Sequence, residues 1–257
     1  CFQAVIINDP GDAAAHSNVG FCSFRLGRQE AAIAAYRRAV ELEPGDPQYA
    51  CDLGNVCLKL SRHAEAVEAY QKAIKADSNF SHAHLGLGEA FWRLGNHEQA
   101  VASLHTAIRL DPTCSQAFST LGVIYLERRQ FTEARDCLQK ALEIRHDDAA
   151  VHERMARVCE AAGWQRDAII AREEAARLQP FSSRAQCILG ESYTRMGQWK
   201  KAFNAYQRAL RLQPELAAAK VGLTIAHQKL EEEEHEKAST TNGDLEQPSI
   251  ETSHDSA

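Results

Sequence analysis

Apolar and small residues recur along this chain in a pattern that repeats every 34 residues. In the clearest copy, residues 183–216, a Leu-Gly pair is followed by an aromatic residue, two alanines seven positions apart and a proline near the end. Earlier copies place the same pair at Leu53-Gly54, Leu87-Gly88 and Leu121-Gly122. A fixed period of this length is typical of repeat architectures. The pattern therefore predicts a series of helix-turn-helix units.

The period divides most of the chain into six complete units. We expect them at 13–46, 47–80, 81–114, 115–148, 149–182 and 183–216. Residues 1–12 keep the same register, because Phe2 and Pro10 fall at the aromatic and proline positions, so they are expected to be the second helix of a truncated preceding unit. Since the chain enters this register part-way through a unit, we interpret it as a fragment of a longer array.

Alanine occupies two positions of every unit without exception. These positions are Ala32, Ala66, Ala100, Ala134, Ala168 and Ala202 in one set, and Ala39, Ala73, Ala107, Ala141, Ala175 and Ala209 in the other. Exposed helix positions would accept Lys, Glu or Gln as well. The periodic glycine costs about 1 kcal/mol inside a helix, so it too needs a packing reason. Both features predict close contact between the two helices of a unit.

Glycine and proline mark the turns. Glycines at 27, 95, 163 and 197 separate the two helices of four units, and Ser61 and Arg129 take that place in the other two. Glycine suits a left-handed helix end. Prolines at 44, 112, 180 and 214 end the second helix or open the next turn, because proline disrupts a helix interior.

Together these positions resemble the tetratricopeptide repeat family over residues 1–230, and agreement across six units makes the match specific. The resemblance implies an all-α fold, a right-handed α-solenoid whose first helices line a concave groove. It also implies the usual function of such arrays, which is to hold an extended peptide or a partner helix.

The end of the chain departs from the pattern. Residues 217–236 read as a single helix with no second helix after it, which resembles the capping helix that closes such arrays. Residues 237–257 are polar and poor in aromatics, so we expect a disordered acidic tail. Residues 231–257 hold nine acidic residues and one lysine, which leaves 28 basic and 26 acidic residues before them.

The unit at 149–182 is irregular. Met155-Ala156 replaces Leu-Gly, and Cys159 and Arg172 stand where aromatics are common. Ordinary drift explains these changes; the alternative is a weaker interface that acts as a hinge or a specialised pocket.

Composition narrows the class of protein. No apolar run approaches the roughly 18 to 20 residues that a membrane-spanning helix needs, and no signal segment opens the chain. The eight cysteines are scattered through helical pattern without a Cys-x-x-Cys pair, so we expect small buried thiols in a reducing, cytoplasmic setting. A near-neutral repeat region does not favour nucleic acid, which normally meets a basic face.

The sequence carries no recognisable catalytic motif. The chain has no phosphate-binding glycine loop and no His-Glu-x-x-His pair, so neither a cofactor nor a metal is expected. The leading hypothesis is a non-catalytic scaffold or adaptor that binds a protein segment in the concave groove. The expected groove residues are Asn18, Phe21, Asp52, Asn55, Lys59, Glu89, Trp92, Arg93, Thr120, Arg154, Arg157, Arg184, Glu191 and Arg195.

Three further expectations concern partners. The arginines at 154, 157, 184 and 195 favour an acidic segment, since charge complementarity tunes encounter rate and specificity. The acidic tail could instead fold back on that basic end, and the open N-terminal edge could support self-association. The alternative function is the substrate-recruiting arm of a larger enzyme such as a glycosyltransferase.

Overall fold

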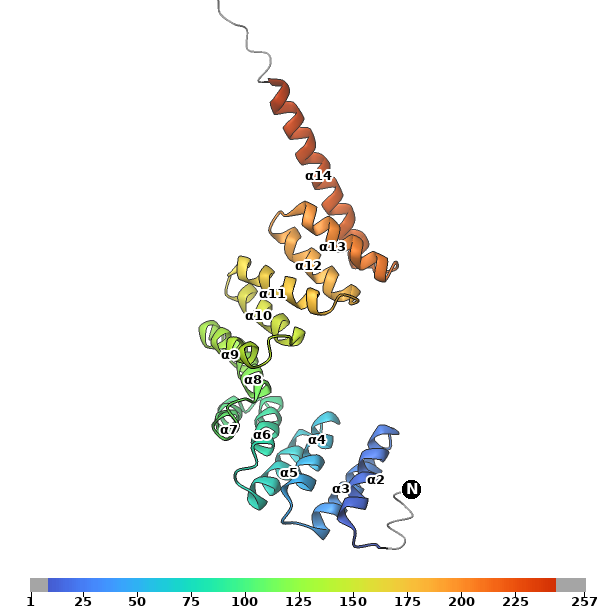
Figure 1. The fold of residues 1–257 in the computed structure, drawn as a ribbon, viewed down its shortest axis with the longest axis vertical. Coiled ribbons are helices and arrows are strands. Elements are labelled where there is room, and N and C mark those ends of the chain that lie inside the picture. Colours follow the sequence, from blue (N-terminus) through green and yellow to red (C-terminus); the bar gives the residue numbers. More distant parts are fainter. Residues whose placement is uncertain (1–8, 244–257) are drawn as a thin grey trace, which may run out of the picture. The chain divides into compact units, whose positions relative to one another are not determined.

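The computed structural model describes residues 9–243, and this part of the chain is entirely α-helical apart from turns (Figure 1). The first helices of the pairs are α2 (Ala13–Arg25), α4 (Pro47–Lys59), α6 (Ser81–Arg93), α8 (Ser115–Glu127), α10 (Ala149–Ala161) and α12 (Ser183–Arg195). The second helices are α3 (Gln29–Leu42), α5 (His63–Ala76), α7 (His97–Leu110), α9 (Phe131–Ile144), α11 (Gln165–Leu178) and α13 (Trp199–Leu212). Helix α14 (Ala217–Gly243) ends the series.

The chain divides into two compact units, residues 1–162 and residues 163–257. Within the first unit α4 packs on α5, α5 packs on α6, and α4 also contacts α6. Within the second unit α12, α13 and α14 contact one another in the same way. This stacking of helix pairs on their neighbours is that of an all-α repeat solenoid, so the predicted fold class is confirmed. The boundary between the units falls inside the irregular stretch 149–182.

The expected burial of the repeated alanines is confirmed. All twelve are at most 2% exposed. A side chain no larger than a methyl group at these positions lets neighbouring helices approach closely, because packed interiors leave no space for more.

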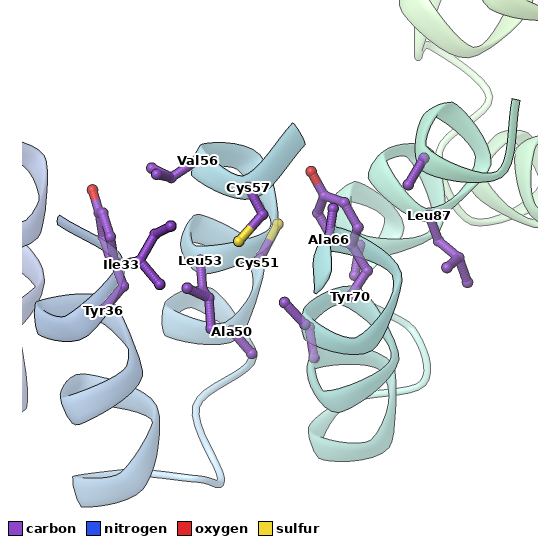
Figure 2. Close-up of a cluster of buried hydrophobic side chains, with 14 of the residues drawn as sticks. Ile33, Tyr36, Ala50, Cys51, Leu53, Val56, Cys57, Ala66, Tyr70 and Leu87 are labelled. Atoms are coloured by element: carbon purple, nitrogen blue, oxygen red, sulfur yellow. The ribbon is translucent and has the colours of Figure 1, made fainter. Parts of the chain in front are cut away.

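The repeated glycine of the first helix makes room for a large side chain of the second helix. A Cβ atom placed on Gly54 would lie 2.6 Å from the Tyr70 ring, and one on Gly88 would lie 2.6 Å from Leu104 Cγ. Tyr70 is fully buried in the cluster that Figure 2 shows, to which Leu53 and Cys51 of α4 also belong. Close helix approach was therefore the right expectation, and the ring is what requires it.

Tyr70 also needs a glycine in the next pair. A Cβ on Gly86 of α6 would meet the Tyr70 ring at 2.3 Å, and the relation recurs between Tyr206 and Gly222. Where the second helix carries Leu104 instead, the matching position of the next first helix holds Thr120. At this step a smaller residue in the second helix is accompanied by a larger one in the next first helix, which suits a densely packed core.

The turns between paired helices adopt the left-handed conformation expected for them. The glycines at 27, 95, 163 and 197 have φ between +65° and +80°, and Ser61 (60°) and Arg129 (59°) adopt the same region without being glycine. Left-handed backbone is costly for a residue with a Cβ. The prolines at 44, 112, 180 and 214 each follow the end of a second helix.

The last helix extends further than expected. We expected the capping helix to end at 236, and α14 continues to Gly243. The remainder of the expected acidic tail, residues 244–257, lies outside the described residues, as do residues 1–8 of the expected truncated repeat.

We expect Gly86→Ala to lower the free energy of unfolding by about 1–3 kcal/mol through overpacking against Tyr70, although alanine is the better helix former by about 1 kcal/mol. In a Tyr70→Leu background the same change should be neutral or stabilising, because leucine already coexists with Thr120 one period later. Urea denaturation of the four proteins measures this coupling. Additive effects would show that the two positions are not coupled.

Replacing Arg129 with glycine should stabilise the chain by about 1 kcal/mol, because it removes the cost of a left-handed residue that carries a Cβ. Arg129→Ala is the control, since it removes the same side chain and keeps the Cβ. A melting temperature that rises equally in both variants would show that the side chain, and not the backbone, is responsible.

Candidate functional site

The first helices of the first unit enclose a hollow of about 380 Å³ between α4, α6 and α8. Asn55 and Glu89 are the expected groove residues that line it. The other lining residues are Gln48, Cys51, Phe80, His82, Leu85, Gly86 and Gln116. Except for Phe80, which precedes α6, all belong to first helices. This is the face on which the groove was expected.

Asn55 is held by the buried tyrosine. The Tyr70 hydroxyl donates to Asn55 Oδ1 at 2.8 Å, and the Asn55 amide lies 3.9 Å from Cys51 Sγ. Burial raises the pKa of the Tyr70 hydroxyl, so it remains a donor. The ring that fills the space between two glycines therefore also fixes a polar side chain at the wall of the hollow.

Two acidic side chains of this region each accept a hydrogen bond from a glutamine. Gln116 donates to Glu89 Oε1 at 2.6 Å, and Gln48 donates to Asp52 Oδ1 at 2.9 Å. Burial raises the pKa of Asp52, while the hydrogen bond from Gln48 acts to lower it. Since a carboxylate has about four lone-pair sites, both groups can accept further donors from a ligand.

Trp92 and Arg93 contact each other at the end of α6. The Trp92 indole N–H donates to Glu127 Oε2 at 2.8 Å, and the Arg93 guanidinium lies 4.5 Å from the Trp92 ring centre. Stacking of this kind is a cation–π contact. It leaves the guanidinium of Arg93, an exposed residue, able to meet a partner.

Aromatic and cationic side chains also meet near α2. Phe21 is 52% exposed, and Asn18 on the same helix is exposed as well. The Arg25 guanidinium lies 5.9 Å from the Phe21 ring, and Lys59 Nζ lies 5.7 Å from the Phe24 ring. An exposed aromatic beside a cation offers both apolar area and charge to a protein partner.

Near α10, some of the expected groove residues already make hydrogen bonds within the protein and others do not. Thr120 is 6% exposed, and its hydroxyl donates to the Gln116 carbonyl within α8 at 2.9 Å. The Arg154 guanidinium donates to the hydroxyl of Ser119, which is 1% exposed. Arg157 is exposed and makes no hydrogen bond or ion pair with other described residues. Arg157 is thus the freer cation of the pair.

The remaining expected residues lie in the second unit on α12. Arg184 and Arg195 are exposed. Glu191 accepts a weak contact from Cys187 Sγ at 3.8 Å. The four arginines of the expected basic end therefore belong to two separate units.

Sequence reasoning missed Gln48, which both lines the hollow and holds Asp52. The signal was present, because Gln48, His82 and Gln116 stand one repeat apart and all line the hollow.

The described cysteines are free thiols. Four of them, Cys51, Cys57, Cys159 and Cys187, are buried as expected. Cys22 is exposed, so the expectation of a buried thiol is wrong there, because its position on α2 faces solvent. Between residues 9 and 243 no cluster of three metal-ligating side chains occurs, and none of the helices described is long and apolar enough to cross a membrane.

Paired helices with left-handed turns and a groove lined by first helices define a tetratricopeptide-repeat solenoid, which is a protein-interaction scaffold. Residues 5–192 match the family described as the cilia and flagella-associated protein 70 C-terminal domain, and residues 183–216 match the tetratricopeptide repeat. Since the first match covers more than half of the chain, the chain belongs to that family. The comparison with curated proteins gave no match.

Solved structures share the fold. Pseudomonas aeruginosa pilF is 20% identical with a TM-score of 0.66, over 81% of this chain and 95% of that one. The Cut9–Hcn1 hetero-tetramer of APC/C is 17% identical with a TM-score of 0.68, over 88% and 44%. YrrB, a TPR protein with an unusual peptide-binding site, is 21% identical with a TM-score of 0.55, over 72% and 95%. At these identities the likeness is one of fold.

Cys51 at the wall of the hollow makes stability depend on pH. Burial raises the pKa of this thiol from 9.0 to about 12. Below pH 9 the thiol is neutral in both states; above it the unfolded state ionises first, so stability falls by up to about 1.4 kcal/mol per pH unit from this group. Cys51→Ala should flatten the fall measured by urea denaturation between pH 9 and 11.

Cys22→Ala is the matched control for this experiment, since it removes one exposed thiol. Identical slopes for the wild type and Cys51→Ala would show that the Cys51 thiol ionises equally in the folded and unfolded chains.

Proposed function

We propose that the chain is a non-catalytic scaffold that binds an extended segment of a partner protein in the groove of its first unit. The observation that carries this proposal is the hollow between α4, α6 and α8, where Asn55 is held in place by Tyr70. A polar side chain fixed before binding loses less entropy when a ligand arrives. The Glu89 carboxylate and the amides of Gln48, Asn55 and Gln116 at the wall suit the backbone N–H and C=O groups of an extended peptide.

Proteins of the same fold support a groove of this kind. YrrB has an unusual peptide-binding site, and Cut9 is found in a hetero-tetramer with Hcn1. Both are repeat solenoids, so a peptide or a partner helix is the ligand class we propose here.

The partner that we propose carries an acidic residue opposite Arg157. This guanidinium is exposed at the α10 end of the first unit and is not paired with a described carboxylate. Arg154 contributes its charge nearby, although its hydrogen bond to Ser119 limits its movement. Within the second unit, Arg184 and Arg195 are separate candidates for pairing with acidic side chains of a partner.

The family match suggests the setting. Because the family is named for a cilia and flagella-associated protein, we propose a partner within a ciliary or flagellar assembly. The cytoplasmic location that we propose is the one at such an assembly. The alternative of a substrate-recruiting arm of an enzyme gains no support from the family or the neighbouring folds. Self-association through the N-terminal edge remains a prediction, since residues 1–8 lie outside the described range.

Arg157→Glu should weaken binding of the partner by about 0.5–2 kcal/mol, because an exposed attraction worth up to about 1 kcal/mol becomes a repulsion. The effect should shrink as salt is raised. Quantitative crosslinking and pull-down from ciliated cells, followed by affinity measurement with the recovered partner, tests this.

Lys72→Glu is the matched control, because it makes the same charge change at an exposed residue on the second helix α5. Equal loss of partner binding in both variants would show that the effect comes from the change in net charge alone. An unchanged partner list for Arg157→Glu would refute the groove assignment.

A further inference from the structure

A second hollow, of about 530 Å³, lies wholly within the second unit between the end of α11, α12 and α13. Its walls include Ala176 of α11, Gln186, Leu189 and Tyr193 of α12, and Arg208 of α13. It shares no residue with the groove of the first unit, so an occupant here would contact a different part of the chain.

One wall of the hollow is formed by Ala176, which is the smallest residue at its position in the repeats. The equivalent position of every other second helix holds a larger aliphatic side chain, namely Val40, Ile74, Ile108, Leu142 and Leu210. All five are half-buried, and Val40, Ile74, Ile108 and Leu210 pack against clusters that include the following first helix. Ala176 lines the hollow together with Leu189 and Tyr193, and all three are less than a tenth exposed. The hollow is therefore large enough to take an aliphatic side chain of the kind that this position carries in the other repeats.

The walls also carry a polar group that lacks a partner. Gln186 is only 6% exposed, and its buried Oε1 has no hydrogen-bond donor among the described side chains. An unpaired buried acceptor is costly, so a donor that entered the hollow would be favoured after a small rotation of the amide. Buried polar groups of this kind normally find a partner.

The charges at the rim favour an acidic neighbour. The Glu173 carboxylate accepts a hydrogen bond from the Tyr193 hydroxyl at 2.5 Å and lies 3.9 Å from Lys201 Nζ, so its charge is already balanced within the protein. Arg177 pairs with Glu174 at 2.8 Å. Arg208 is exposed and has no ion pair with a described residue, and a guanidinium of this kind binds carboxylates well.

We propose that this hollow binds a leucine or isoleucine side chain of an extended partner segment, with an adjacent aspartate or glutamate paired to Arg208. The aliphatic side chain takes the place that the chain's own residue fills in other repeats. A backbone N–H of the segment supplies the donor that Gln186 lacks. This is a side-chain pocket separate from the proposed groove, and it does not depend on that groove being used.

The test is selection of a random dodecapeptide display library on the full chain. The wild type should enrich peptides with Leu or Ile next to Asp or Glu. Ala176→Leu should weaken the enriched peptide by about tenfold or more, since the new side chain occupies the hollow. Replacement of the peptide's leucine by alanine should have a similar effect. Arg208→Gln should weaken binding severalfold, and Arg208→Lys should restore part of it.

The melting temperature of Ala176→Leu should equal or exceed that of the wild type, which shows that lost binding is not lost folding. No enrichment on the wild type, enrichment of basic motifs, or equal binding to Ala176→Leu would each overturn the inference. Peptides that bind Ala176→Leu normally but fail on Arg157→Glu would also overturn it, while supporting the groove of the first unit.

Discussion

One packing relation recurs at two steps of this solenoid, where a buried tyrosine of a second helix lies between glycines of two consecutive first helices. Tyr70 contacts the positions where Gly54 and Gly86 lack a Cβ, and Tyr206 does the same at Gly190 and Gly222. The relation sets how closely pairs approach, because the ring fills the space that a side chain would take. It also reaches the groove, since the Tyr70 hydroxyl holds Asn55.

Most of the fold was predictable because each part of it leaves a local signal. Alanines that are never replaced mark close contacts, prolines mark helix ends, and glycine at a turn marks a left-handed residue such as Gly95. Residue preference alone would not place Ser61 and Arg129 in this conformation, and only their position in the period indicated it. The length of α14 was also missed, since its polar last turns have no packing pattern to read.

The groove was less predictable than the fold. A repeat position tells which face a residue occupies, but not whether its polar group is already used. The Thr120 hydroxyl donates to a backbone carbonyl of its own helix and Arg154 donates to Ser119, whereas Arg157 remains available to a ligand. Hydrogen bonds between side chains on different helices, such as Gln116 with Glu89, follow from the three-dimensional packing and leave no mark in the period.

Departures from the repeat differ in whether a neighbour compensates for them. Leucine at 104 in place of tyrosine is matched by Thr120 in place of glycine, so volume is conserved and the core stays closed. Alanine at 176 is not matched in this way, because Gln186, Leu189 and Tyr193 leave the hollow beside it unfilled. An unfilled hollow lacks the dispersion contacts that a larger side chain at this position would make. The paired change at Leu104 and Thr120 is what sequence drift under a packing constraint produces. The unpaired change at Ala176 leaves contacts unmade, and a ligand can supply them. The hollow at Ala176 is therefore the better candidate for a binding pocket.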